Sequence, residues 1–275
     1  MNVNFITDQV ILGDSIKVLQ SLPSASFDHC ITDPPYNITG KSAKRKIGWL
    51  ESNATWKQEK KFSKIDEAWD SFLDDDYEKF TKLWLSEIHR VVKPNGNILV
   101  FGSYHNIYRI GLTLEEMNLK INNSIIWYKR NAFPNITRRM LCESTEQIVW
   151  AVNESRDVAK NWVFNYEELK MLTDNGKQMR NMWDIPTTPT SERKFGKHPS
   201  QKPLKLSERL IRGFTEPGSR ILDPFSGSGS FLVAAHVWQR GYLGIDRDPD
   251  FVKLANRRLM NAPARALLLP TEDLT

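Results

Sequence analysis

The stretch ILDPFSGSGSFLVAA, Ile221 to Ala235, joins a short apolar run to a glycine-containing loop and then to a longer apolar run. The first run ends at Asp223 and is typical of a buried strand, and the second has the composition of a buried helix. Gly227 and Gly229 allow a tight turn between them and let the backbone approach a ligand closely. The stretch therefore predicts a strand–loop–helix unit that resembles a nucleotide-binding turn. It is neither the GxGxxG fingerprint nor a P-loop, because the third glycine and a following Gly-Lys pair are missing.

Strand-like runs and helical patterns alternate over the rest of the chain. This alternation predicts an α/β fold with a doubly wound, mostly parallel sheet. We expect a single domain over residues 1–275, because 275 residues suffice for one large α/β domain with insertions. The expected strands cover residues 10–12, 27–32, 97–101, 124–128, 147–152, 220–223 and 241–246, and the expected helices cover 15–22, 75–92, 107–116, 204–213, 231–240 and 249–260.

Four acidic residues come at or just past the ends of strand-like runs, namely Asp14, Asp33, Asp223 and Asp246. Ligands of open parallel sheets bind at the carboxyl ends of the strands, so these residues predict a ligand-binding edge. Asp246 ends the strand that follows the glycine loop, where a carboxylate can accept both ribose hydroxyls of a nucleoside. A tight turn with a capping aspartate is the simpler interpretation of either feature alone.

The stretch ITDPPYN, Ile31 to Asn37, is rigid. Two consecutive prolines remove two backbone donors and fix two φ angles, and each favours extended geometry in the residue before it. Asp33 and Pro34 therefore lie on a stiff, extended piece of chain with an aromatic residue, Tyr36, beside them. A strand end with a rigid turn is one interpretation, and a fixed acceptor site is the other.

Three stretches together resemble one family. DPPY at residues 33–36, HPSQKP at 198–203 and DPFSGSGS at 223–230 are similar to motifs IV, X and I of the S-adenosylmethionine-dependent DNA amino-methyltransferases. DPPY comes first and the glycine loop last, an order that resembles the β class, a circular rearrangement of the common methyltransferase fold. The resemblance extends from about Val10 to Met260.

The resemblance implies S-adenosyl-L-methionine as the cofactor and a flipped-out base as the substrate. The exocyclic amine of a base is a poor nucleophile, and two fixed acceptors can orient it for in-line displacement. The implied catalytic residues are Asp33 and Pro34, as acceptors, and Tyr36, as the surface on which the base stacks. His198 precedes a proline, where a turn residue is the commoner interpretation. The residues implied to line the cofactor site are Asp14, Asp33, Ser200, Lys202, Asp223, Phe225, Ser226, Gly227, Gly229 and Asp246.

The charge distribution favours a polyanionic partner. The formal net charge is +5 and the pI about 9.1, and the segment 41–64 alone has eight Lys or Arg and two Glu side chains. We interpret residues 40–66 as a basic loop that contacts DNA phosphate, with a solvated lid as the alternative. Residues 155–190, which show weak periodicity, are the candidate insertion for target recognition. The candidate DNA-binding residues are Lys41, Lys44, Arg45, Lys46, Arg130, Arg138 and Arg139.

Adenine N6 in double-stranded DNA is the favoured target, because in the resembling family Asp at the first position of the DPPY motif is typical of adenine enzymes. Cytosine N4 is the nearest alternative, and methylation of RNA or of a protein amide is another. A DNA-binding module with a degenerate cofactor site is a further class. Pairing with a restriction endonuclease and homodimer formation are left open.

The composition also predicts the cellular location. No apolar run approaches 18 residues, and the N-terminus has no basic region before an apolar stretch, so neither a membrane span nor a signal peptide is expected. The two cysteines, Cys30 and Cys142, make no disulfide framework, and no Cys/His cluster has zinc spacing, so no metal is expected. A cytoplasmic protein is therefore expected.

Overall fold

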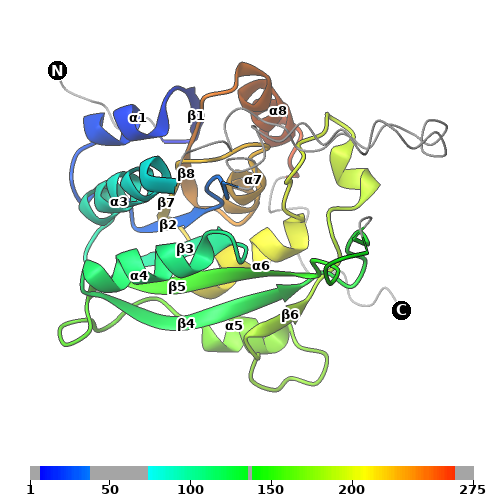
Figure 1. The fold of residues 1–275 in the computed structure, drawn as a ribbon, viewed down its shortest axis with the longest axis horizontal. Coiled ribbons are helices and arrows are strands. Elements are labelled where there is room, and N and C mark those ends of the chain that lie inside the picture. Colours follow the sequence, from blue (N-terminus) through cyan, green and yellow to red (C-terminus); the bar gives the residue numbers. More distant parts are fainter. Residues whose placement is uncertain (1–6, 38–73, 136–137, 264–275) are drawn as a thin grey trace.

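The computed structural model describes residues 7–37, 74–135 and 138–263. Within these residues the strands form one eight-stranded sheet in the order β1-β8-β7-β2-β3-β5-β4-β6 (Figure 1). Only β5 runs antiparallel to its neighbours, and all other neighbouring pairs are parallel. The predicted α/β fold with a mostly parallel sheet is therefore confirmed. The strands are β1 (Gln9–Leu12), β2 (His29–Thr32), β3 (Asn97–Gly102), β4 (Leu119–Tyr128), β5 (Thr145–Ser155), β6 (Met182–Asp184), β7 (Arg220–Asp223) and β8 (Gly241–Asp246).

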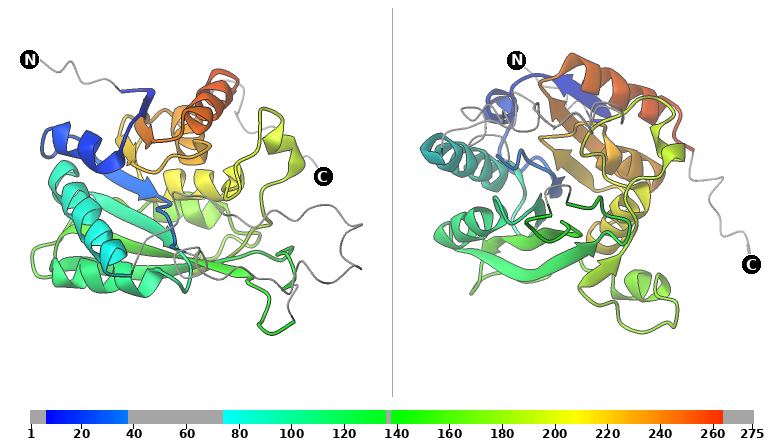
Figure 2. Two further views of the ribbon diagram at one scale, coloured as in Figure 1. Left: turned by 45° about the horizontal axis from the view of Figure 1, so that its top comes forward. Right: turned by 45° about the vertical axis from the view of Figure 1, so that its right-hand side comes forward.

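Helices cover both faces of this sheet (Figure 2). Successive residues of a strand point to opposite faces, and β2 and β3 are buried over their whole length, so each face has its own apolar core. Ile31 lies in the core beneath α5, α6 and α7, whereas Cys30 lies in the core beneath α1, α3 and α4. The helices are α1 (Ser15–Ser21), α3 (Asp74–Val91), α4 (Ile107–Glu116), α5 (Tyr166–Met171), the 3₁₀-helix η3 (Thr190–Arg193), α6 (Leu204–Phe214), α7 (Ser230–Val237) and α8 (Pro249–Met260).

The strand order places the first strand and the last strand of the described residues side by side. β7 and β8, from the last quarter of the chain, lie between β1 and β2. From the β2–β7 pair the chain runs outward in both directions, with α3 crossing to β3 on one face and α7 crossing to β8 on the other. This reversal opens a crevice at the carboxyl ends of β2 and β7, which is where doubly wound sheets bind ligands.

The structure differs from the sequence analysis mainly between β4 and α6. β4 and β5 are ten and eleven residues long and extend well past the expected strands at 124–128 and 147–152. The segment 155–190 contains α5 and β6, and three of its residues, Leu169, Trp183 and Ile185, belong to the apolar core. The basic loop at 40–66 lies outside the described residues. Across the described residues, no helix is both long and apolar enough to cross a membrane.

Asn97 joins β3 to three other parts of the fold. Its fully buried side chain accepts from Trp150 Nε1 at 2.9 Å and donates to the carbonyls of Val163 and Phe214 at 2.8 and 2.7 Å. We expect Asn97→Ala to lower the free energy of unfolding by about 3 kcal/mol, because it leaves buried polar groups without partners. Urea denaturation would measure this. Asn123→Ala, at an exposed position of β4, is the control, and an equal loss in both variants would contradict the role of Asn97.

Candidate active site

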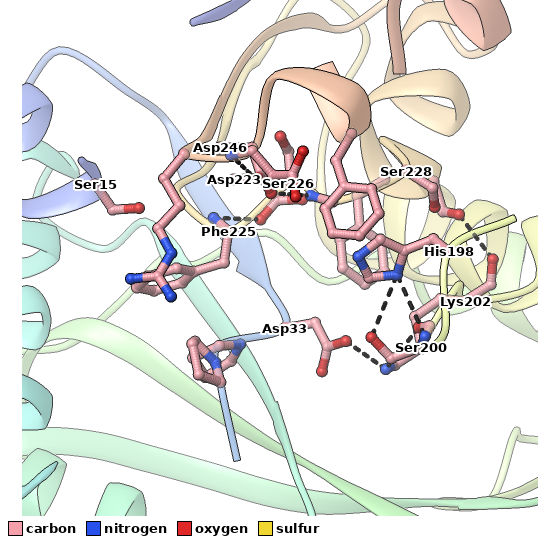
Figure 3. Close-up of a pocket in the computed structure, with 18 of the residues that line it drawn as sticks. Ser15, Asp33, His198, Ser200, Lys202, Asp223, Phe225, Ser226, Ser228 and Asp246 are labelled. Atoms are coloured by element: carbon pink, nitrogen blue, oxygen red, sulfur yellow. Dashed lines mark hydrogen bonds and ion pairs between the residues drawn. The ribbon is translucent and has the colours of Figure 1, made fainter. Parts of the chain in front are cut away.

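A cavity opens at the crevice between the carboxyl ends of β2 and β7 (Figure 3). The rigid DPPY stretch, the HPSQKP segment and the glycine loop all contribute to its walls, although they are far apart in the sequence. His198 lines it too, whereas Gly229 does not. The other predicted residues that line the cavity are Asp14, Asp33, Pro34, Tyr36, Ser200, Lys202, Asp223, Phe225, Ser226, Gly227 and Asp246.

The two glycines of the loop are required by close packing. Gly227 has φ +47°, and a Cβ at this position would lie 2.8 Å from the ring nitrogen Nε2 of His198. Gly229 has φ +71°, and its Cβ would lie 2.9 Å from Cβ of Ala255 in α8. Both values of φ lie in the left-handed region that favours glycine. The loop therefore follows a path that brings its backbone to the cavity wall at Gly227 and to α8 at Gly229.

Asp223, the last residue of β7, is the most buried carboxylate of the cavity, with 1% of its surface exposed. Its Oδ1 accepts from the Thr32 hydroxyl at 2.8 Å and from the Phe225 amide at 3.2 Å. Among the described residues its Oδ2 has no hydrogen-bond partner. Burial, together with the nearby charges of Asp33 and Asp246, raises the pKa of Asp223 to about 8. The site thus contains a buried carboxyl with one oxygen unused.

Asp246 and Asp14 have structural partners as well as cavity positions. Asp246 accepts from the Gly227 amide at 2.8 Å and from the Asp248 amide at 2.9 Å, and burial raises its pKa. Asp14 caps α1 by accepting from the Lys17 amide at 3.0 Å. Asp14 therefore caps a helix and also lines the cavity. Asp246 fixes the glycine loop and still lines the cavity.

Phe225 separates the cavity from the apolar core. Its ring centroid lies 5.8 Å from that of Phe80 and 5.5 Å from that of Trp84, the latter in an edge-to-face contact. Phe225 also lines the cavity. One side chain therefore lines the cavity and also packs against the aromatic residues of α3.

The DPPY stretch is held on both sides by hydrogen bonds. The Tyr36 hydroxyl donates to Oδ1 of Asp33 at 2.6 Å, and the Tyr77 hydroxyl of α3 donates to the Pro35 carbonyl at 2.7 Å. Lys202 donates to Oδ2 of Asp33, as the dashed line in Figure 3 marks. The sequence placed Lys202 beside the cofactor, whereas its ammonium contacts the carboxylate of the DPPY motif. The HPSQKP segment therefore joins the cofactor wall to this motif.

Two charged residues next to the DPPY stretch, Glu146 and Lys129, are among those that escaped the sequence analysis. Glu146 of β5 lies 3.2 Å from Lys202 Nζ and accepts from the Tyr36 hydroxyl at 3.1 Å, and its other oxygen lies 3.2 Å from Lys129 Nζ. Because β5 runs antiparallel, its beginning lies at the edge where the other strands end. An acidic residue at the start of an apolar run indicates a position at the ligand-binding edge only if the strand is known to run antiparallel.

Charges in this group of side chains shift one another's pKa values. Burial raises the pKa of Asp33, and Lys202 opposes that effect. Burial would also raise the pKa of Glu146, but Lys202 and Lys129 together hold it below its usual value. Burial disfavours the charge of Lys202, yet the two carboxylates raise its pKa. Burial and the same two carboxylates raise the pKa of Tyr36, so its hydroxyl stays protonated and donates.

The candidate DNA-binding residues that the structure describes lie outside the cavity. Arg138 and Arg139 are exposed in the connection between β4 and β5. Arg130, in the same connection, lies 2.8 Å from Asp184 at the end of β6. The strand directions place this connection at the same edge of the sheet as Asp33. Lys41, Lys44, Arg45 and Lys46 lie outside the described residues.

The fold and the cavity define a Rossmann-like methyltransferase, a class in which a glycine loop and strand-end carboxylates face one crevice. Residues 27–257 match the family described as DNA methylase, which comprises the N6 and N4 enzymes. The chain therefore belongs to this family of S-adenosylmethionine-dependent DNA amino-methyltransferases, as the three motifs indicated.

Similar proteins agree with this assignment. The chain is 37% identical over 252 residues to the Type II methyltransferase M2.LlaDCHI of Lactococcus lactis subsp. cremoris, covering 91% of this chain and 88% of that protein. It is 36% identical, with the same coverage, to the Type II methyltransferase M2.DpnII of Streptococcus pneumoniae. The crystal structure of the M1.HpyAVI–SAM complex matches with a TM-score of 0.64 at 26% identity, covering 91% of this chain and 98% of that one. The cytosine-N4-specific PvuII methyltransferase shares the fold at 17% identity, with a TM-score of 0.66 over 94% of this chain and 89% of that one.

The buried carboxyl of Asp223 predicts a measurable pH dependence of stability. Its pKa is raised from 3.8 to about 8, so between these values the folded protein binds a proton that the unfolded chain has lost. The stabilisation is complete below the lower value and is lost as the pH rises through the upper one, with a slope of about 1.4 kcal/mol per pH unit.

We therefore expect Asp223→Asn to reduce the difference in unfolding free energy between about pH 5 and about pH 8. Denaturant titrations at several pH values would measure it. Asp157→Asn, at an exposed position, should keep the pH profile of the unsubstituted protein. Parallel profiles for Asp223→Asn and the unsubstituted protein would contradict the assignment.

Proposed function

We propose that this protein transfers a methyl group from S-adenosylmethionine to the N6 amine of an adenine flipped out of double-stranded DNA. The observation that carries the proposal is that one cavity contains both the glycine loop after β7 and the DPPY stretch after β2. Cofactor and acceptor groups can thus meet at one place, which in-line transfer between two bound molecules requires.

The residues present fit the cofactor. The unpartnered Oδ2 of Asp223 is a buried carboxyl oxygen, and it would become an acceptor for the methionine ammonium once that positive charge favours the ionised form of Asp223. The glycine loop leaves a backbone cradle at Gly227. Asp246, at the end of β8, would accept the ribose hydroxyls, and Asp14 would lie toward the adenine. When bound, S-adenosylmethionine supplies an electrophilic methyl sulfonium. Phe225, Ser226, Ser200 and Lys202 would complete the wall, and Gly229 would act only through the shape of the loop.

The DPPY stretch would orient the target amine. The carboxylate of Asp33 and the carbonyl of Pro34 would accept the two N–H groups and draw density onto the nitrogen as it attacks. Tyr36 would offer its ring to the flipped base, which recovers roughly 1–3 kcal/mol of the cost of unstacking. The hydroxyl of Tyr36 is anchored on Asp33 and Glu146, which supports a fixed orientation of the ring.

DNA contact would concentrate at the edge of the sheet where the cavity opens. Arg138 and Arg139 are exposed at this edge and can reach phosphates, together with the basic residues 41–46. For target recognition, the end of the segment 155–190 is better placed than its beginning. β5 carries the chain to the opposite edge at Ser155, and β6 brings it back toward the cavity at Asp184.

Adenine as the target is supported by Asp33 at the first motif position, and cytosine N4 is the alternative. Relatives described as Type II methyltransferases support pairing with a restriction endonuclease. A homodimer and a cytoplasmic location stay predictions.

The first test is incubation with labelled S-adenosylmethionine and unmethylated duplex DNA of mixed sequence, followed by digestion and mass spectrometry of the nucleosides. We expect N6-methyladenine. N4-methylcytosine would establish the alternative target. Label in RNA or protein, or in no polymer, would contradict the proposal.

Asp33→Ala should lower the rate of methyl transfer by about 100- to 1,000-fold, because one of the two acceptors for the amine is lost. Cofactor affinity, measured by calorimetry, should stay within about threefold, since Asp223 and Asp246 are unchanged. Asp157→Ala removes an exposed carboxylate and serves as the control. Transfer at the unsubstituted rate by Asp33→Ala would exclude this residue as the acceptor.

Asp246→Ala should weaken cofactor binding by about 10- to 100-fold, because the ribose hydroxyls lose the carboxylate to which they would donate and the Gly227 amide loses its acceptor. Calorimetric titration with S-adenosylmethionine would measure the change. Asp250→Ala, an exposed carboxylate four residues along, should bind as the unsubstituted protein does. Equal affinities for Asp246→Ala and Asp250→Ala would refute the ribose role.

A further inference from the structure

Lys202 is shared between two carboxylates that come from different parts of the sheet. Its ammonium contacts Oδ2 of Asp33, at the end of β2, and lies 3.2 Å from Oε2 of Glu146, at the start of β5. The hydroxyl of Tyr36 spans the same two carboxylates, at 2.6 Å from Asp33 and 3.1 Å from Glu146. Asp33 and Glu146 therefore form a pair of acceptors that hold one ammonium and one hydroxyl between them.

This group of side chains is buried and balanced in charge. The side chain of Lys202 is 4% exposed, that of Glu146 is 15% exposed and that of Asp33 is 14% exposed. The second oxygen of Glu146 lies 3.2 Å from the ammonium of Lys129. Two acids are thus matched by two lysines. In such surroundings the loss of one partner leaves a buried charge without compensation, which is strongly unfavourable.

The contacts of Lys202 and Tyr36 compete with the task proposed for Asp33. To orient the target amine, Asp33 must accept a hydrogen bond from it, and each of its oxygens already accepts one, Oδ1 from Tyr36 and Oδ2 from Lys202. A carboxylate oxygen can accept a second bond, but a charged donor binds the shared oxygen more strongly than a neutral amine does. The ammonium of Lys202 is the stronger competitor, because it is charged and buried. When the amine arrives, the ammonium needs another acceptor within reach, and Glu146 is already in contact with it.

We propose that Glu146 is a positioning residue that takes over the ammonium of Lys202 when the target amine binds to Asp33. The inference rests on the proposed methyl transfer at Asp33. Lys202 favours the ionised form of Asp33 before the base arrives. Glu146 then retains Lys202 and the Tyr36 hydroxyl while Asp33 engages the amine. No charge leaves the site, so the exchange requires only a small movement of one ammonium group.

The charges that face Asp33 predict opposite effects for the two partners. Lys202 and Tyr36 lie against Asp33, Glu146 lies across from it, and Asp223 is the nearby acid of β7. The negative charge of Glu146 raises the pKa of Asp33, and the positive charge of Lys202 lowers it. Glu146→Gln should therefore shift the acidic limb of the transfer rate to lower pH, and Lys202→Met should shift it to higher pH.

The test is single-turnover methyl transfer to a duplex that the unsubstituted enzyme methylates, measured between about pH 5 and pH 9. We expect Glu146→Gln to lower the transfer rate by about 100-fold, because Lys202 then stays on Asp33 and the amine is misplaced. Cofactor affinity should remain within about threefold. Glu143→Gln removes the same charge from an exposed position three residues away and is the matched control.

The double variant Glu146→Gln/Lys202→Met separates this role from a purely structural one. It removes both charges of one contact and should transfer methyl faster than Glu146→Gln, because no ammonium remains to occupy Asp33. Its acidic limb should lie between those of the two single variants. If Glu146→Gln does not fold, the double variant can be compared with Lys202→Met alone. The acidic limb of its transfer rate should still lie at lower pH than that of Lys202→Met, since the charge of Glu146 is absent.

Four outcomes would overturn the inference. In the first, Glu146→Gln matches the unsubstituted rate with an unmoved acidic limb. In the second, the double variant transfers methyl no faster than Glu146→Gln. In the third, the acidic limb of the double variant lies at the same pH as that of Lys202→Met. In the fourth, the unsubstituted enzyme transfers no methyl group to any polymer, which would overturn the proposed function as well. The first three, with an active unsubstituted enzyme, would leave the proposed function intact.

Discussion

The parallel pairing of β2 with β7 is the constraint on which the site depends. It brings Cys30 beside Leu222, so Asp33 and Asp223 emerge at neighbouring points of the same edge. Because α3 and α7 cross on opposite faces of the sheet, neither of these two helices closes the crevice between the two strands. The rigid DPPY stretch and the glycine loop, 190 residues apart in the chain, therefore share one cavity. The buried contact between Lys202 and Asp33 then ties the HPSQKP segment to the DPPY stretch on the far side of that cavity.

The single reversed strand has an equally specific consequence. Parallel strands bring only their carboxyl ends to the ligand-binding edge, and the antiparallel β5 adds the beginning of a strand to it. Glu146 comes to the DPPY stretch for this reason, and the β4–β5 connection with its exposed arginines lies at the same edge. The opposite end of β5 carries the chain away from the cavity, so the segment 155–190 begins far from the site, and three of its residues pack in the core.

The site is costly to fold because it concentrates acids in a buried place. Asp33, Asp223 and Asp246 all have pKa values raised by burial, and Asp223 keeps an oxygen without a partner among the described residues. Buried carboxyls with unused acceptors are disfavoured unless a ligand satisfies them. The rest of the fold offsets this cost through two apolar cores, one on each face of the sheet. The arrangement is what a protein needs if its acceptors must be in place before the cofactor and the base arrive.

The sequence by itself determined the fold class, the family and the three motifs that form much of the cavity wall. These depend on local patterns: strand–loop–helix units, rigid prolines and glycines that turn tightly, each readable within about ten residues. It did not determine the extent of β4 and β5, the helix and strand within 155–190, or the presence of Glu146 and Lys129 at the site. It also placed Lys202 by motif, beside the cofactor, and not by its contact with Asp33. Only the tertiary structure decided these points, because strand order, strand direction and the pairing of buried charges depend on contacts between residues far apart in the chain.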